Sequence, residues 1–162
     1  MEAEKVLLLK ARYRYNTAMD ITPEDIKSAG VKAILIDADN TLSFHNSKEP
    51  YPGVTEWIRK IQRSGIPIVI ISNNKKERIA PFAERLGLSY VEHGAKPLPN
   101  GLLRACRRLG IKPSEAAVIG DQVFTDVLGG NLIKAKVFLT EPLGEDTNKF
   151  IKFKRKLEKF VR

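Results

Sequence analysis

Five short apolar runs along the chain predict strands that are buried on both faces. The runs cover residues 32–36, 67–71, 88–91, 116–119 and 136–139, and most of them are near-continuous in Val, Ile, Leu or Ala. A continuous apolar run of this length is typical of a parallel sheet, because helices then cover both of its faces. Residues 1–20 show no clear pattern and are expected to form an arm or an extra helix.

The segments between these runs predict helices with readable ends. Thr22 followed by Pro23 and two acids indicates a helix start, and Gly30 a stop. Apolar residues recur at helical spacing before Gly65, at Val54, Trp57, Ile58 and Ile61. Two further helices are expected over residues 76–86 and 100–109, each ending at a glycine. Strands alternating with helices predict an α/β fold with right-handed crossovers.

Composition and charge limit the partners and the location that are expected for the protein. The chain has 162 residues and a net charge of +9, but residues 149–162 alone hold seven basic residues and one acid. The basic excess is therefore a property of the tail, which argues against nucleic-acid binding over the whole surface. With one cysteine, Cys106, and no recognisable signal peptide or membrane-length run, a cytoplasmic location is expected.

Polar side chains follow the predicted strands at the point where each strand ends. Asp37 and Asp39 follow the first run, Ser72 the second, and Asp121 with Asp126 the fourth; Lys96 lies in the loop after the third. Ligand sites in parallel sheets lie beyond the carboxyl ends of the strands, so these groups are expected to converge. Carboxylate oxygens are ligands that Mg²⁺ prefers, and a hydroxyl with an ammonium group suits a phosphate ester.

At these residues the chain resembles the haloacid dehalogenase (HAD) superfamily of phosphohydrolases. Its four motifs are matched in order by residues 37–41, by Ser72 with Asn73, by residues 96–97, and by residues 120–121 with Asp126. Residues 71–74 and 120–131 more narrowly resemble the IIIA-type, YqeG-like branch, which is related to phosphatidylglycerophosphate phosphatases. The resemblance implies a Rossmann-like parallel sheet sandwiched between helices, in one domain over residues 1–162 and without a substantial cap.

The resemblance also assigns a role to each residue of the site. Asp37 would be the nucleophile that forms an aspartyl-phosphate, and Asp39 the general acid and base. Asp37, the backbone carbonyl of Asp39, Asp121 and Asp126 would surround Mg²⁺. Ser72 and the amide of Asn73 would hold the phosphate, and Lys96 would neutralise it. Because residues two apart share one face of a strand, Asp37 and Asp39 can act separately only if the chain turns after Asp37, with Asn40 in the turn.

The superfamily's dehalogenases and ion pumps lack an acid two residues after the nucleophile. The presence of Asp39 at that position therefore favours a phosphatase or a phosphotransferase. The short stretch of residues 42–53 leaves little room for a cap, so an open site is expected. An open site suits a lipid head group, and phosphatidylglycerophosphate in phospholipid synthesis is the substrate that the resemblance favours. The alternatives are a phosphatase of another phosphate ester, large or small, and a scaffold protein whose basic tail docks on RNA, a ribosome or a protein.

The basic tail is expected to form an amphipathic helix over residues 145–162. One stripe carries Phe150, Phe153, Leu157, Phe160 and Val161, and the other side carries Lys152, Arg155, Lys156, Lys159 and Arg162. Such a helix could lie on an anionic membrane surface, which would make the protein peripheral on the inner membrane face. It could equally pack its apolar stripe on the domain and expose its charges, as most surface helices do. RNA contact ranks behind both, and nothing in the sequence fixes the oligomeric state.

Overall fold

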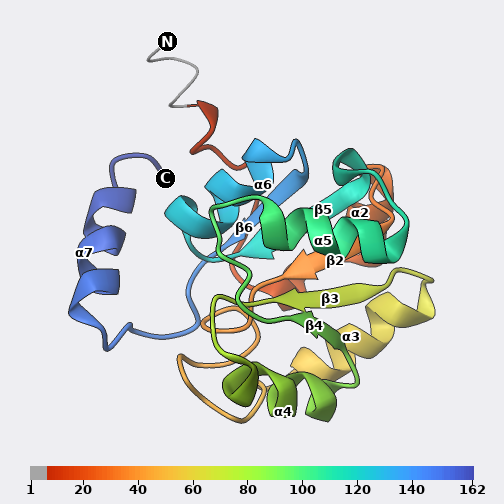
Figure 1. Cartoon of the computed structure of the whole chain (residues 1–162), viewed down its shortest axis with the longest axis horizontal. Coiled ribbons are helices and arrows are strands. Elements are labelled where there is room, and N and C mark those ends of the chain that lie inside the picture. The colour runs from red at the N-terminus through yellow and green to blue at the C-terminus, as the bar shows by residue number, and fades with distance from the viewer. Residues whose placement is uncertain (1–6) are drawn as a thin grey trace.

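A computed structural model of the chain describes residues 7–162 and contains one six-stranded parallel sheet (Figure 1). The strand order is β1-β6-β5-β2-β3-β4. The strands are β1 (Tyr13–Tyr15), β2 (Ala33–Ile36), β3 (Ile68–Ile71), β4 (Ser89–Val91), β5 (Ala116–Gly120) and β6 (Lys136–Thr140). All five neighbouring pairs are parallel, with Leu35 opposite Val69 and Val118 at the centre of the sheet.

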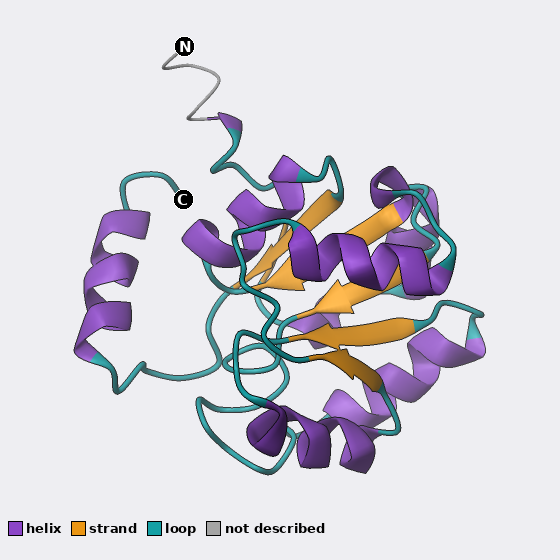
Figure 2. Ribbon diagram, in the orientation of Figure 1, coloured by secondary structure: helices purple, strands orange, loops and turns teal. Residues whose placement is uncertain are grey.

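Helices lie on both sides of the sheet, as the alternation of apolar runs and helical segments predicts (Figure 2). They are α2 (Pro23–Ser28), α3 (Val54–Arg63), α4 (Lys76–Leu86), α5 (Asn100–Leu109), α6 (Leu128–Leu132) and α7 (Lys149–Glu158). Shorter turns are the 3-10 segments Ala18–Asp20 and Pro113–Glu115, and a π-helical turn at Val123–Val127. The predicted Rossmann-like sandwich of helices around a parallel sheet is confirmed.

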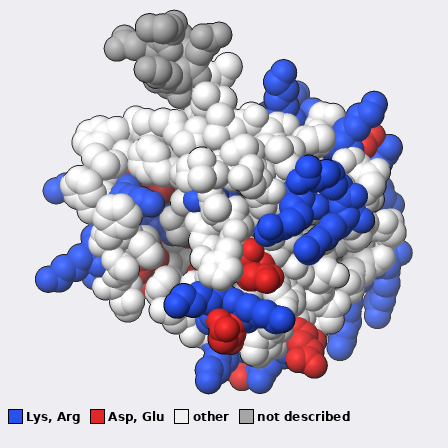
Figure 3. All heavy atoms as spheres, in the orientation of Figure 1, with Lys and Arg blue, Asp and Glu red and all other residues white. Residues whose placement is uncertain are grey.

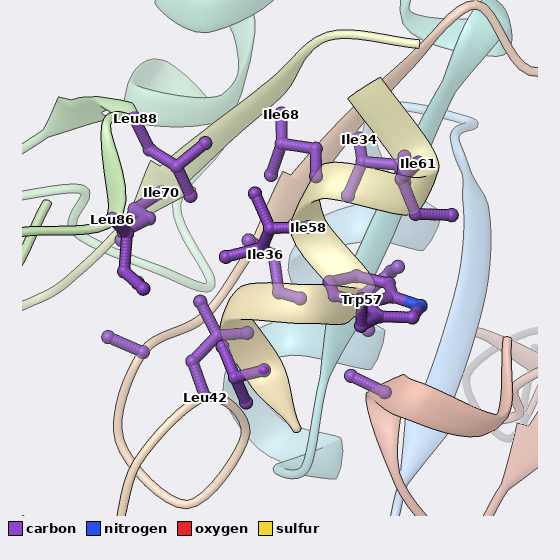
Figure 4. Close-up of a cluster of buried hydrophobic side chains, with 14 of the residues drawn as sticks. Ile34, Ile36, Leu42, Trp57, Ile58, Ile61, Ile68, Ile70, Leu86 and Leu88 are labelled. Carbon is purple, nitrogen blue, oxygen red and sulfur yellow. The ribbon is translucent and has the colours of Figure 1, made fainter. Parts of the chain in front are cut away.

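Alternation along each strand divides the buried side chains between the two faces. Ile34 and Ile36 of β2 point to one side, where α2, α3 and α4 cover them, and Leu35 points to the other, where α5 lies. The first of these clusters is drawn in Figure 4, with Trp57 of α3 at its margin. The indole of Trp57 donates a hydrogen bond to the carbonyl of Ile21 over 2.8 Å, so its one polar group is satisfied in the core.

The start of the described chain holds a strand that the sequence pattern did not reveal. Residues 13–15 form β1 at the edge of the sheet, where an arm or a helix was expected, and residues 1–6 lie outside the described part. The ring of Tyr13 stacks on Phe138 of β6 with centroids 4.4 Å apart. A three-residue edge strand held by such a contact is too short to show a period of two.

The strand order places a topological switch point at the middle of the sheet. From β2 the chain builds outward through β3 to β4 and then returns to β5 on the opposite side of β2. Ligands of open α/β sheets bind outside the carboxyl ends of the strands at such a point. The crevice therefore opens between Asp37, which follows β2, and Asp121, which follows β5.

The C-terminal helix is shorter than expected and lies at the margin of the domain, at the left of Figure 1. It begins at Lys149 rather than near residue 145, because Asn148 caps it by accepting a hydrogen bond from the backbone N–H of Phe150 over 2.8 Å. The preceding residues 141–148 form a loop that contains Pro142 and Gly144. Among residues 7–162, no helix combines the length and hydrophobicity needed to cross a bilayer.

Candidate functional site

The chain turns sharply after Asp37, which is the condition under which Asp37 and Asp39 can act separately. The backbone N–H of Asp37 still belongs to the sheet and donates to the carbonyl of Ile119 over 2.9 Å. Asn40 then adopts a left-handed backbone with φ of 58°, a conformation that asparagine tolerates better than most residues. The carbonyl of Ala38 accepts from the N–H groups that follow, at residues 41, 42 and 43. Asp37 and Asp39 consequently leave the strand in different directions.

Three carboxylates meet at the switch point. Asp37, Asp121 and Asp126 each offer an oxygen within 4.8 Å of the others. Asp121 and Asp126 are buried, and 11% of the Asp37 side chain is exposed. Burial, followed by the charges of the neighbouring acids, raises the pKa of Asp37, and burial raises the pKa of Asp121 to about 7. Oxygen donors held this close fit a hard divalent cation such as Mg²⁺, whose charge would offset their mutual repulsion.

Lys96 reaches this cluster from the loop after β4. Its Nζ lies 2.9 Å from Asp37 Oδ1 and 2.6 Å from Asp126 Oδ1, with 3% of the side chain exposed. Burial alone would lower the pKa of Lys96, but the carboxylates of Asp126 and Asp37 raise it above its usual value. Lys96 therefore stays charged, and it holds the carboxylate of Asp37 in position.

The residues after β3 support this lysine and form another part of the pocket lining. The side-chain amide of Asn73 donates to the carbonyl of Lys96 over 3.0 Å and accepts from its N–H over 2.9 Å. The side chain of Asn73 thus braces the Lys96 loop, which leaves a contact with phosphate to its backbone. The hydroxyl oxygen of Ser72, itself buried, accepts from the backbone N–H of Asn74 over 3.0 Å.

Asp39 has partners of its own, which sequence reasoning missed. Its carboxylate accepts from Arg78 Nη2 over 2.8 Å, from the side chain of Asn74, and from the backbone of Asn46 over 3.0 Å. Arg78 stands in the first turn of α4, directly after the residues that follow β3. The sequence signal that could have revealed this contact is a basic residue so soon after β3, although an arginine in the first turn of a helix more often points into solvent.

The largest departure from expectation is Arg155 of α7. The tail pattern placed Arg155 on the basic side of the helix without a partner, but its guanidinium contacts the carboxylate of Asp121 and donates to the Asp121 carbonyl over 2.6 Å. Its Nε also lies 2.9 Å from Asp146 Oδ2. An arginine here is compatible with buried acids, because its planar group bonds several oxygens at once. The position of Arg155 could not be foreseen from periodicity, since periodicity separates the apolar from the basic side of the helix but does not say which side meets the domain.

The site residues surround a pocket of about 200 Å³. Its lining comes from the ends of three strands, from residues near Asp121, and from α7: Asp37, Asp39, His45, Ser72, Asn73, Asn74, Lys96, Gln122, Thr125, Ile151 and Lys154. Asp121 and Asp126 are buried and do not belong to this lining, but Asp126 is paired with Lys96, which does. No cap domain covers the site among residues 7–162, and the site is less open than expected because Ile151 and Lys154 form part of its wall.

Gly120 allows Asp126 to approach the end of β5. A Cβ at Gly120 would lie 2.2 Å from Asp126 Cγ, and Asp126 is buried and tied to Lys96, so it has nowhere to move. We expect Gly120→Ala to lower the free energy of unfolding by about 2 kcal/mol and to weaken Mg²⁺ binding at least about tenfold. Urea unfolding and titration calorimetry would measure the two effects.

Gly110→Ala is the matched control for that substitution. Gly110 ends α5 with φ of 65°, and nothing lies within 4 Å of an added Cβ. The strain of that backbone costs about 1 kcal/mol, and Mg²⁺ affinity should not change. Equal Mg²⁺ affinity in both variants would show that the contact between Gly120 and Asp126 does not shape the site.

Comparisons with known proteins agree with this geometry. A family model described as haloacid dehalogenase-like hydrolase matches residues 5–133. The chain is 36% identical to "Probable phosphatase YqeG" of Bacillus subtilis over 141 residues, which are 87% of this chain and 82% of the relative. It is 27% identical to "Phosphatidylglycerophosphatase GEP4, mitochondrial" of Saccharomyces cerevisiae, over 81% of this chain and 78% of that protein.

A solved structure shows the same fold. It is the D,D-heptose 1,7-bisphosphate phosphatase of B. bronchiseptica, complexed with magnesium and phosphate, which is 16% identical with a TM-score of 0.56. The match covers 67% of this chain and 80% of that one. Together with the family match over most of the chain, these likenesses lead to one conclusion. The chain belongs to the haloacid dehalogenase-like hydrolase family, as an enzyme of the phosphatase type.

Proposed function

We propose that the protein is a Mg²⁺-dependent phosphomonoester hydrolase that works through an aspartyl-phosphate on Asp37. The observation that carries the proposal is the position of Asp37, which is at once a wall of the pocket, a member of the carboxylate cluster and the partner of Lys96. A carboxylate with only a structural role would not need two further acids beside it, because the burial and the repulsion of each acid lower the stability of the fold.

In the first step, a carboxylate oxygen of Asp37 attacks phosphorus and the bond from phosphorus to the ester oxygen breaks. Asp39 donates a proton to the departing alkoxide, so the alcohol leaves neutral. Ser72, the backbone N–H of Asn73, and Lys96 hold the phosphoryl oxygens. Lys96 already lies within 2.9 Å of Asp37, so its charge is in place before phosphate binds.

In the second step, Asp39 takes a proton from a water molecule as this water attacks phosphorus. The bond between phosphorus and Asp37 breaks, which releases inorganic phosphate and restores the carboxylate. Arg78 and Asn74 hold the Asp39 carboxylate at the pocket wall through both steps. Two transfers at a fixed carboxylate thus replace one difficult hydrolysis.

Mg²⁺, held by Asp37, Asp121, Asp126 and the backbone carbonyl of Asp39, would neutralise the negative charge that gathers on the transferred phosphoryl group. The burial and clustering of the three acids support this assignment. Arg155 also contacts Asp121, so it would share this carboxylate with the cation.

Removal of divalent cations is expected to abolish phosphate release, and added Mg²⁺ should restore it. The same addition should raise the melting temperature, since a cation that binds only the folded protein stabilises it. In Asp121→Asn both effects should be weak, because a principal carboxylate donor is lost. Calorimetric melting with and without EDTA tests the binding independently of activity, and an unchanged melting temperature would contradict a Mg²⁺ site here.

For the substrate we propose a phospholipid phosphomonoester, with phosphatidylglycerophosphate as the first choice. The name of the yeast relative supports it, as does a pocket without a cap domain and with lysine at its wall. His45 and Lys154 line the same pocket and can meet the second phosphate of such a lipid. The proposal includes a single domain over residues 1–162. It also places the protein in the cytoplasm, at the inner face of the membrane.

The test compares phosphate release from phosphatidylglycerophosphate in mixed micelles with release from p-nitrophenyl phosphate and a panel of soluble esters. We expect the lipid to be preferred in kcat/KM by at least about a hundredfold, as differential binding of a head group allows. Preference for a soluble ester would retain the chemistry and discard the lipid. Without release from any ester, a scaffold role would replace the enzyme.

A further inference from the structure

The helix α7 is attached to the domain by its charged face. Glu158 is buried, and its Oε1 accepts from the backbone N–H of Val123 over 2.9 Å. Arg155 bonds Asp121, Asp146 and Glu158, and Arg162 donates to the carbonyls of residues 121 and 140 over 2.9 and 3.1 Å. Among the apolar residues of the expected stripe, Val161 alone packs on the domain. The ordinary arrangement, with the apolar stripe inside, is therefore reversed.

The opposite face of α7 exposes large apolar side chains. The exposed fractions are 64% for Phe150, 58% for Phe153, 43% for Leu157 and 84% for Phe160. At 3.6 residues per turn Phe150, Phe153 and Leu157 share one side of α7, and Phe160 lies in the turn that follows it. Exposed apolar side chains that gather in this way mark an interaction surface, because a soluble domain gains nothing by leaving them in water. We call these four residues the apolar stripe.

Lysines border the apolar stripe. Four exposed lysines lie on one flank, between the apolar stripe and the face of the helix that is attached to the domain: Lys149, Lys152, Lys156 and Lys159. At the left margin of Figure 3, where α7 lies in Figure 1, basic side chains project from the edge of an uncharged surface. Aromatic and aliphatic groups flanked by lysine suit an anionic bilayer, where the rings enter the acyl boundary and the ammonium groups meet phosphates.

The same helix is a wall of the active-site pocket. Ile151, on the face of α7 that is attached to the domain, and Lys154, between that face and the apolar stripe, line the pocket with Asp37 and Lys96. The Lys154 Nζ also lies 4.8 Å from the centroid of the Phe150 ring. Whatever binds the apolar stripe is therefore brought next to the mouth of the pocket.

We propose that α7 docks the protein on an anionic lipid bilayer through the apolar stripe and its bordering lysines, with the pocket mouth facing the head groups. The supply of a lipid substrate at that mouth rests on the proposed function. RNA is disfavoured as the occupant, because its phosphates would require the basic residues at the centre of the contact. Here the centre is apolar and the lysines form the border.

Co-sedimentation with vesicles tests the docking. Vesicles of phosphatidylglycerol and phosphatidylcholine are compared with vesicles of phosphatidylcholine alone, using wild type and Phe150→Ser/Phe153→Ser. We expect wild type to prefer the anionic vesicles and the double variant to bind them at least about tenfold more weakly. Leu132→Ser, at a site on α6 that is 46% exposed, is the matched control and should bind as wild type does.

A tryptophan reporter locates the contact on the helix. Trp57, the one native tryptophan, is buried, so Phe153→Trp adds a distinct exposed indole. On anionic vesicles its emission should shift to shorter wavelength and be quenched by brominated acyl chains. If this indole stays in water while the protein binds, or if RNA is bound and vesicles are not, the docking proposal fails.

Activity on p-nitrophenyl phosphate separates this proposal from the proposed function. Phe150 and Phe153 do not line the pocket, so the double variant should hydrolyse the soluble ester at the wild-type rate. Vesicle binding without any hydrolysis by wild type would support the docking and overturn the enzyme. Hydrolysis without vesicle binding would do the reverse.

Discussion

Asp37→Asn is expected to lower the rate of phosphate release by at least about 1,000-fold, the scale seen when a nucleophile is removed. The amide has the shape of the carboxylate but cannot attack phosphorus. The fold should survive, because the charge that is lost is a buried one whose pKa is raised by burial and by Asp126 and Asp121. Steady-state release of phosphate and urea unfolding would measure the two properties on the same protein.

Asp20→Asn is the matched control for the nucleophile. Asp20 is also a hydrogen-bonded carboxylate, which accepts from the backbone N–H and the hydroxyl of Thr17 over 2.9 Å, but it lies outside the active-site pocket. We expect its activity to equal that of wild type. Residual activity of Asp37→Asn within about tenfold of wild type would mean that another group carries the phosphoryl transfer.

Lys96→Met should cost both activity and stability. It leaves the carboxylates of Asp37 and Asp126 buried without their cation, and breaking a buried pair in this way costs about 3 kcal/mol or more. Urea unfolding in EDTA measures the loss without compensation by added metal. Phosphate release should become undetectable, since the phosphoryl charge and the position of Asp37 both depend on this lysine.

Lys32→Met provides the comparison for Lys96. Lys32 forms an ion pair of similar length with Glu115, at 2.7 Å, but 66% of its side chain is exposed. Such an exposed pair contributes little to stability, because solvent screens it. In the double variant Asp37→Asn/Lys96→Met, one unpaired acid is gone, so the combined loss should be smaller than the sum of the single losses. Equal losses for Lys32→Met and Lys96→Met would contradict the central role of the buried pair.

The sheet and its edge were predictable because local and global signals agree there. Each buried strand is a continuous apolar run, and helix ends are marked by Thr22 and by Gly87 and Gly110. The rule that ligands bind at the carboxyl ends of parallel strands then brings Asp37, Ser72 and Lys96 together. The roles of these residues come from the resemblance to a family, and the structure adds only their proximity and contacts.

What the sequence could not supply are contacts between distant segments. Arg155 meets Asp121 across 34 positions of the chain, and Arg78 meets Asp39 across 39. Hydrophobic periodicity divided α7 into an apolar and a basic side but left open which of them faces the domain, and the alternative in which the apolar side packs inward is wrong. A buried Glu158 that bonds the Val123 N–H favours the other side, and no single-sequence pattern reports such a bond. β1 was missed for a different reason, since three residues show no period.

The most direct test of the aspartyl-phosphate is to trap it. In Asp39→Asn, p-nitrophenyl phosphate should still phosphorylate the protein, because its leaving group needs no proton, while hydrolysis stalls without a base. After an acid quench, mass spectrometry should find one phosphoryl group on the peptide that contains Asp37, and none in Asp37→Asn/Asp39→Asn. An Asp39→Asn protein that turns over substrate but carries no phosphoryl group, or carries it elsewhere, would contradict the mechanism.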